Sequence, residues 1–153
     1  MCSVIADRNR RQGLSVIEVD GLLVTDSVFS NTHGTAPGAG IDMEPNENTE
    51  QIKHVRVVGS KFLDNEGAGI LIYGRKGADN ISDVEISRNL FTGALPIKIK
   101  YAPRVLDSAI CRNRQILPPR KEQAQLSSSP FVETAAQVVH QSECGDPRLR
   151  IRY

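Results

Sequence analysis

The sequence predicts an all-β solenoid, a chain that coils through about four stacked turns, and three observations lead to this prediction. Four segments begin alike at intervals of 27, 29 and 27 residues: Gly13-Leu-Ser-Val-Ile, Gly40-Ile-Asp-Met-Glu, Gly69-Ile-Leu-Ile-Tyr and Pro96-Ile-Lys-Ile-Lys. Apolar and polar residues alternate along them, which is the period of a β-strand and not of a helix. Turns rich in Asn, Asp and Gly close the repeats, and a unit that recurs at a fixed interval indicates stacked structural repeats.

A second strand-like stretch follows each of these repeat starts. Three of the stretches end in phenylalanine: Leu22–Phe29, Val55–Phe62 and Val84–Phe91. A degenerate fourth copy begins at Ala109. Two or three short strands per repeat would form a coil whose Ile, Val and Phe side chains point inward, with backbone hydrogen bonds between successive turns. Four turns at the ordinary strand spacing would be roughly 20 Å long.

The repeats occupy residues 1–116, and residues 117–153 differ in composition, being richer in Pro, Gln and Ser. Residues 1–12 resemble the close of an earlier turn, so we expect the chain to be part of a longer solenoid; a simple N-terminal arm is the alternative. Apolar residues recur at helical spacing over 130–143. The last segment is therefore interpreted as a capping helix or as a loosely ordered tail.

The composition excludes several classes of protein. The 153 residues suit one modest domain, with 39% hydrophobic residues, 24% charged residues and no Trp. No apolar run approaches the length of a membrane-spanning helix, so we expect no membrane partner. The net charge of +1 combines an acidic first half with a basic second half. The basic half has few aromatic residues to stack on bases and its charges are scattered, so we expect no nucleic-acid partner.

The alternation also assigns the two faces of the stacked repeat starts. Ile41 and Met43 would point into the core. The outward positions would then form two columns across the turns: Ser15–Asp42–Leu71–Lys98 and Ile17–Glu44–Tyr73–Lys100. These columns bring two carboxylates, a phenol and two amines to one outer face of the coil.

The run from Asn9 to Asn46, and above all its Gly40-Ile-Asp-Met-Glu-Pro stretch, resembles the pectate-lyase-like superfamily. The resemblance covers about residues 1–115 and implies a right-handed parallel β-helix. It implies function only broadly, because the superfamily includes polysaccharide lyases, hydrolases, C5-epimerases, phage tail spikes and proteins with no known activity. The Asp-Pro-His-Asp signature of alginate epimerases and the paired aspartates of polygalacturonases are lacking. The resemblance also implies an extracellular or virion location, which the sequence itself leaves open.

An acidic polysaccharide is the partner that this resemblance implies for the outer face. The candidate catalytic residues are Asp42, Glu44 and Tyr73, acting in lyase- or epimerase-like abstraction of a ring proton next to a uronate. Basic side chains would bind the uronate carboxylates and neutralise their charge. The candidate substrate-binding residues are Lys98, Lys100, Arg75, Arg11 and His33.

Other uses of the same residues stay open. Asp42, Glu44 and Glu47 could hold Ca²⁺, which takes oxygen ligands; otherwise no cofactor is expected. Two acids at i and i+2 on a strand lie about 6.6 Å apart, near the lower bound for inverting glycosidases. Asp42 and Glu44 could equally be solvated, or Asp42 could bind loop backbone. The alternative function is a non-catalytic structural or polysaccharide-binding solenoid of the tail-spike or adhesin type, and exposed ends of the coil would permit a homo-oligomer.

Overall fold

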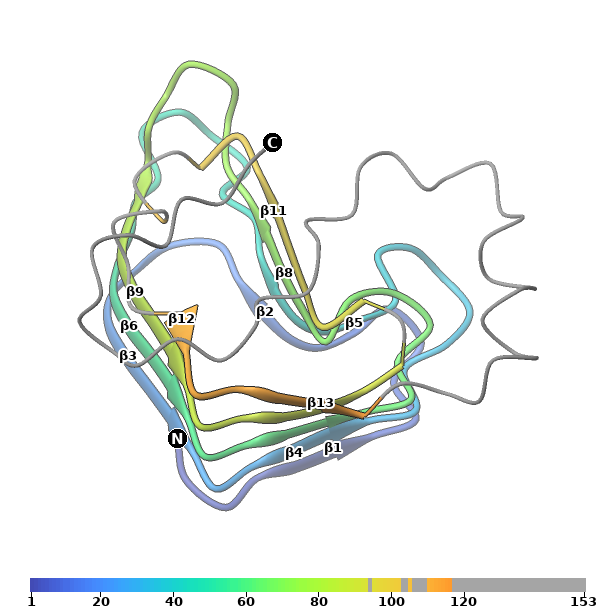
Figure 1. Cartoon of the computed structure of the whole chain (residues 1–153). Coiled ribbons are helices and arrows are strands. Elements are labelled where there is room, and N and C mark those ends of the chain that lie inside the picture. The colour runs from blue at the N-terminus through green and yellow to red at the C-terminus, as the bar shows by residue number, and fades with distance from the viewer. Residues whose placement is uncertain (94, 103–104, 106–109, 117–153) are drawn as a thin grey trace.

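The computed structural model describes residues 1–93, 95–102, 105 and 110–116. It confirms the predicted all-β solenoid, because every pairing between the described strands is parallel. Three sheets wind around one core through about three turns, where the sequence predicts about four (Figure 1). The predicted helix over 130–143 and the rest of 117–153 lie outside the described residues. Among the described residues, no helix is long and apolar enough to cross a membrane.

Three parallel sheets form the sides of the coil. The first sheet contains β2 (Gln12–Val16), β5 (Ala39–Met43), β8 (Ile70–Tyr73) and β11 (Ile97–Lys100). The second sheet contains β3 (Val19–Thr25), β6 (Ile52–Val58), β9 (Ile81–Ser87) and β12 (Ile110–Cys111). The third sheet contains β1 (Ile5–Asp7), β4 (Val28–Ser30), β7 (Lys61–Leu63), β10 (Leu90–Thr92) and β13 (Arg114–Ile116). The four predicted repeat starts are thus the strands of the first sheet.

Each predicted second stretch consists of two strands that meet at a two-residue corner. The first corner residue has a left-handed backbone in three successive turns: φ is 49° at Asp26, 64° at Gly59 and 57° at Arg88. This conformation turns the chain sharply from the second sheet into the third. A full turn therefore holds three strands. β1 pairs in parallel with β4, so residues 5–7 take the place that a third-sheet strand of an earlier turn would take.

Longer connections leave the coil at the two ends of the first sheet. The segments 31–38 and 64–69 connect the third sheet to the first, and 44–51 and 74–80 connect the first sheet to the second. These segments extend outward from the stacked strands, as Figure 1 shows. The first sheet therefore has loops along both of its ends, whereas the corner between the second and third sheets is tight.

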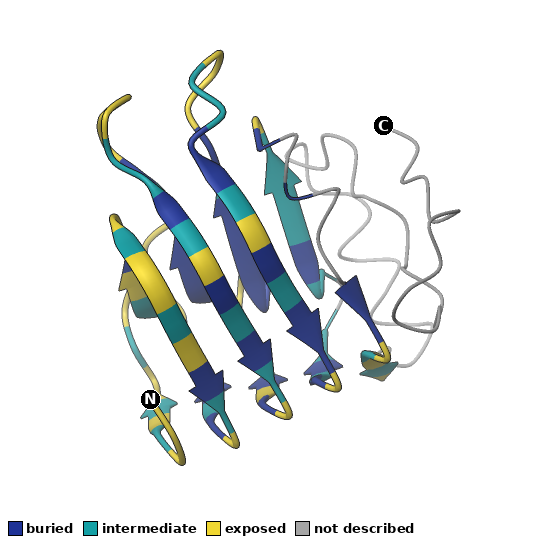
Figure 2. Ribbon diagram, turned by 90° about the vertical axis from the view of Figure 1, so that its left-hand side faces the viewer, coloured by how far each residue is buried: buried dark blue, intermediate teal, exposed yellow. Residues whose placement is uncertain are grey.

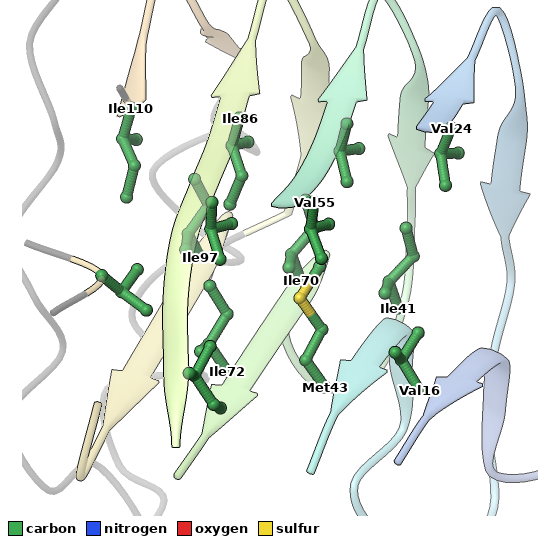
Figure 3. Packing of buried hydrophobic residues seen from close by; sticks show 14 of the residues in the cluster. Val16, Val24, Ile41, Met43, Val55, Ile70, Ile72, Ile86, Ile97 and Ile110 are labelled. Atoms are coloured by element: carbon green, nitrogen blue, oxygen red, sulfur yellow. The ribbon is translucent and has the colours of Figure 1, made fainter. Parts of the chain in front are cut away.

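Ladders of like side chains fill the core. In the first sheet the inward column Leu14, Ile41, Ile70 and Ile97 is in register, beside Val16, Met43, Ile72 and Ile99. Figure 3 shows Ile41, Ile70 and Ile97 of the first column and Val16, Met43 and Ile72 of the second. In the third sheet, the Phe62 ring stacks on Phe29 and on Phe91, with centroids 5.3 and 4.9 Å apart. The three phenylalanines are almost wholly buried.

The glycines that begin the repeats make room for these phenylalanine rings. A Cβ atom on Gly40 would lie 2.8 Å from the Phe62 ring and 2.6 Å from the carbonyl oxygen of Gly69. Gly13 meets Phe29, and Gly69 meets Phe91, in the same way. Glycine is needed here for a close approach inside the core, because any side chain would overlap the ring.

We expect Gly40→Ala to lower the free energy of unfolding by about 1–3 kcal/mol, the usual cost of overpacking a core. The backbone oxygen of Gly69 cannot move away as a flexible side chain would, so the strands themselves must separate. Urea unfolding followed by far-ultraviolet circular dichroism measures the change. Ser15→Ala, on the exposed face of β2, is the control and should stay close to wild type. Equal stabilities for Gly40→Ala and wild type would contradict this packing.

Candidate functional site

The outer face of the first sheet departs from the ordinary pattern of a solenoid surface. Along β6 and β9 of the second sheet, buried residues alternate with more exposed ones, as Figure 2 shows. In β5, by contrast, all five residues are buried, including those that point away from the core. An antiparallel or solenoid strand with a solvated outer face would expose every second residue. Something therefore covers the outer side of β5.

The first predicted column and the Tyr73–Lys100 part of the second lie on this face in the predicted register. The first column pairs residues of four successive strands: Ser15, Asp42, Leu71 and Lys98. In the second column Tyr73 pairs with Lys100. Glu44 directly follows β5, and its amide donates to the Val16 carbonyl at 3.0 Å, so the ladder continues to this residue. The face thus runs from two acids, through Leu71 and Tyr73, to two lysines.

Asp42 is the unusual residue of this face. It is only 2% exposed, and its Oδ1 atom is buried without a hydrogen-bond partner among the described residues. Burial raises the pKa of Asp42 from 3.8 to about 6, because a charged carboxylate loses solvation there. The Glu44 carboxylate adds to the rise in pKa, and the Arg11 guanidinium opposes it. The structure therefore brings Glu44 and Arg11 within electrostatic reach of Asp42.

A small apolar cluster lies outside the main core, beside Asp42. Leu71, the neighbour of Asp42 in the register, packs in it with Ala39 and Ala68. Tyr73 and Leu95 pack against the same cluster. These apolar side chains come from three different turns, and they replace solvent along the outer side of the sheet. The unpartnered carboxyl oxygen is thus next to an apolar surface.

An aromatic and cationic group lies at the β11 edge of the face. The Nζ atom of Lys100 is 5.4 Å from the centroid of the Tyr73 ring and 5.1 Å from that of Tyr101. The two rings meet edge to face, with centroids 5.6 Å apart. Sequence reasoning singled out Tyr73 and Lys100 and missed Tyr101. Tyr101 could have been found as an aromatic residue that directly follows β11, the last strand of the first sheet.

His33 belongs to the loop 31–38, which is held by backbone bonds on both sides. Its amide donates to the carbonyl of Asn9 at 3.0 Å, and its side chain is exposed. Above it, the Gly34 amide donates to the carboxylate of Glu66 at 2.8 Å, and the Glu66 amide donates back to Thr32. The loop is therefore tied to the turns before and after it. Glu66, which sequence reasoning did not single out, is one of the residues that hold it.

Arg75 and Glu47 lie in the loops at the opposite end of the sheet. β8 ends at Tyr73, so the strand does not extend to Arg75, whose Nε atom donates to the side chain of Asn48 at 3.3 Å. Glu47 is exposed, and its amide donates to the carboxylate of Glu50. Among the described residues, no three His, Cys, Asp or Glu side chains gather closely enough to hold a metal ion. The structure adds no support for calcium, which stays a prediction.

The raised pKa of Asp42 is of the kind that suits proton transfer near neutral pH. A carboxyl group with a pKa near 6 is mostly ionised at neutral pH and takes up a proton in mildly acidic solution. Its charge is poorly solvated, and the Glu44 carboxylate and the Arg11 guanidinium lie nearby. Comparisons of the chain with models of known families, with curated proteins and with solved structures found no match.

Proposed function

We propose that the outer face of the first sheet binds an acidic polysaccharide and that Asp42 exchanges a proton with a sugar unit bound there. One observation carries the proposal: Asp42 is a buried outer-face carboxyl group with an unpartnered oxygen and a raised pKa. Acid–base groups work best when their pKa is near the operating pH, and strong perturbations of pKa are typical of functional sites. The resemblance to the pectate-lyase-like superfamily supplies the substrate class.

The proposed step begins with Asp42 as a base. Its carboxylate takes the proton from the ring carbon that carries the uronate carboxyl group, and the positive charge of Arg11, which lies within electrostatic reach of Asp42, favours removal of that proton. In a lyase, the electron pair left on the carbon forms a carbon–carbon double bond and expels the glycosidic oxygen, which takes a proton from Tyr73 or from water. In an epimerase, Tyr73 or water gives a proton to the same carbon from its opposite side, and no glycosidic bond breaks.

A second candidate function, a non-catalytic polysaccharide-binding solenoid, is favoured by the depth of the same carboxyl group. With 2% of its surface accessible, Asp42 meets a sugar only if neighbouring side chains move. Such a protein would bind the polysaccharide through the tyrosines and lysines at the β11 edge of the face. The two candidate functions can be told apart by product formation, because only the enzyme converts the polysaccharide into a new compound.

The test incubates the whole chain with polygalacturonate, alginate and other acidic polysaccharides, with calcium or with a chelator. Ultraviolet absorbance reports unsaturated uronate ends, proton NMR reports epimerised units, and a reducing-end assay reports hydrolysis. We expect a product that forms faster as the pH rises through about 6, the pKa of Asp42. A lower rate in the chelator would support the calcium prediction, and an equal rate would contradict it.

The variants decide which residue is responsible. Asp42→Asn should lose the activity, while Glu18→Gln, which removes an exposed acid between β2 and β3, should keep it. Full activity in a folded Asp42→Asn variant would overturn the role of Asp42. If the folded wild type binds the polysaccharide but yields no product in any of the three assays, the non-catalytic solenoid is the correct function.

A further inference from the structure

We propose that Tyr101, together with Tyr73 and Lys100, forms a subsite that holds one uronic-acid unit of a polysaccharide chain. The ligand class rests on the proposed function above, but the subsite does not require that the protein be an enzyme. It lies on the β11 edge of the first sheet, away from Asp42, and Tyr101 is its new and most exposed member.

Two backbone features fix the position of Tyr101: its left-handed conformation and its close approach to Gly74. Tyr101 follows β11 and has a left-handed backbone with φ of 53°, an uncommon conformation for a bulky residue. The Gly74 amide donates to the Lys100 carbonyl at 2.8 Å. A Cβ atom on Gly74 would lie 2.2 Å from the carbonyl oxygen of Tyr101, so only glycine permits this approach. The end of β8 therefore sets the place of Tyr101 from the turn below.

The side chains present two different chemistries side by side. Tyr101 is 42% exposed, whereas Tyr73 is half-buried and meets it edge to face. Lys100 is held over both rings, with its ammonium 5.1 Å from the Tyr101 centroid. Cation–π contacts of this kind keep the positive charge in one position. The result is an exposed aromatic ring with a fixed ammonium group next to it.

A uronic acid matches this pair of features. One side of a sugar ring is a row of C–H groups that packs against an aromatic ring, and the carboxylate pairs with an ammonium. Lys98, on the same strand, adds a second positive charge to this edge. A neutral sugar would use the aromatic ring alone. The subsite should therefore prefer acidic over neutral chains, and the preference should come from the lysines.

The position of the subsite relative to Asp42 also gives a direction for the bound chain. Lys100 is on β11 and Tyr73 on β8, while Asp42 is on β5, two strands from β11. Two strand spacings amount to about 10 Å. A polysaccharide that lies across the strands, along the axis of the coil, would therefore contact the subsite and the Asp42 region with different units of one chain.

Calorimetric titration of the whole chain tests this subsite. The probes are tetrasaccharides from polygalacturonate and from alginate, each beside its carboxyl-reduced neutral counterpart. We expect Tyr101→Ala to weaken binding of the acidic probe about tenfold, a typical loss for an aromatic stacking residue. Tyr101→Phe keeps the ring and should bind like wild type. Lys100→Gln should remove the preference for the acidic probe, and Leu23→Ala, exposed on the second sheet, is the control.

The outcomes separate the two proposals. If wild type binds the acidic probes and folded Tyr101→Ala binds them equally well, the subsite is wrong and the proposed function stands. If Lys100→Gln keeps the full acidic preference, the charge part of the subsite is wrong. If wild type binds no probe and yields no product, the acidic polysaccharide itself is the wrong ligand. Circular dichroism spectra of all variants confirm that each comparison is made between folded chains.

Discussion

Phe62→Ala is expected to lower the free energy of unfolding by about 3–5 kcal/mol, the usual range for removing a buried phenylalanine. Phe62 is the middle ring of the stack and contacts a phenylalanine in the turn on either side. Its loss leaves a cavity between two turns that the glycine column cannot fill, because Gly13, Gly40 and Gly69 have no side chains to move into it. Urea unfolding monitored by circular dichroism measures the effect.

Two further variants show whether the stack itself is responsible. Phe62→Leu keeps most of the volume and should cost much less than the alanine variant, about 1–2 kcal/mol. Phe91→Ala removes a ring that has one described stacking partner instead of two, so its effect should be smaller than that of Phe62→Ala. Equal losses for Phe62→Leu and Phe62→Ala would contradict a core built on ring contacts.

Asp42→Asn is expected to gain stability and to lose the proposed activity. Because the pKa of Asp42 is raised, the folded state binds more protons than the unfolded state between pH 3.8 and about 6. Wild-type stability therefore falls as the pH rises through this window, and the loss is complete above it. The rise in the pKa of Asp42 corresponds to a loss of about 3 kcal/mol in folding stability at pH 7. The Asp42→Asn variant should regain about 1–3 kcal/mol of this, and any remainder persists because its amide is still a buried polar group. Turnover should fall by about a hundredfold or more.

Unfolding curves measured from pH 4 to pH 8 check the stability part of this prediction. Near pH 4 the difference between Asp42→Asn and wild type should be small, because Asp42 is then protonated in the folded protein. Glu18→Gln, which removes an exposed acid away from Asp42, is measured beside Asp42→Asn as the control. A constant difference between Asp42→Asn and wild type across the range would contradict the raised pKa. A carboxyl group that costs stability and performs no reaction would favour the binding solenoid.

Much of the fold could be predicted because its signals are local. The repeat starts recur along the chain, and the two-residue alternation directly gives the inward and outward columns, which the register of β2, β5, β8 and β11 confirms. The division of each second stretch into two strands was harder to see. The corner residues Asp26 and Arg88 take a left-handed backbone that their identities do not require. The sequence also offers no reason for the repeated glycine, because the phenylalanine ring that it faces belongs to a strand some twenty residues later.

The sequence predicts most of the residues on the outer face of the first sheet but not the burial of Asp42 among them. Alternation places Asp42 outward, and an outward residue is ordinarily solvated. In the structure Asp42 is buried, and its neighbour in the register is Leu71 of the next turn, which is distant along the sequence. Tyr101 escaped notice because its role depends on the close approach to Gly74. Arg75 was placed by extending a strand that ends two residues earlier.

The distribution of loop length around the coil has a consequence for how such a protein can change. Val19 pairs with Ile52 and Ile52 pairs with Ile81, so one turn takes 33 residues and the next takes 29 without loss of register. The loops at the ends of the first sheet absorb the difference. An insertion in 31–38 or 44–51 would therefore alter the border of the candidate site and leave the ladder intact, whereas one extra residue inside β5 would turn Asp42 into the core. Within one turn, the loops can therefore change which ligand is bound, while the strands keep the fold.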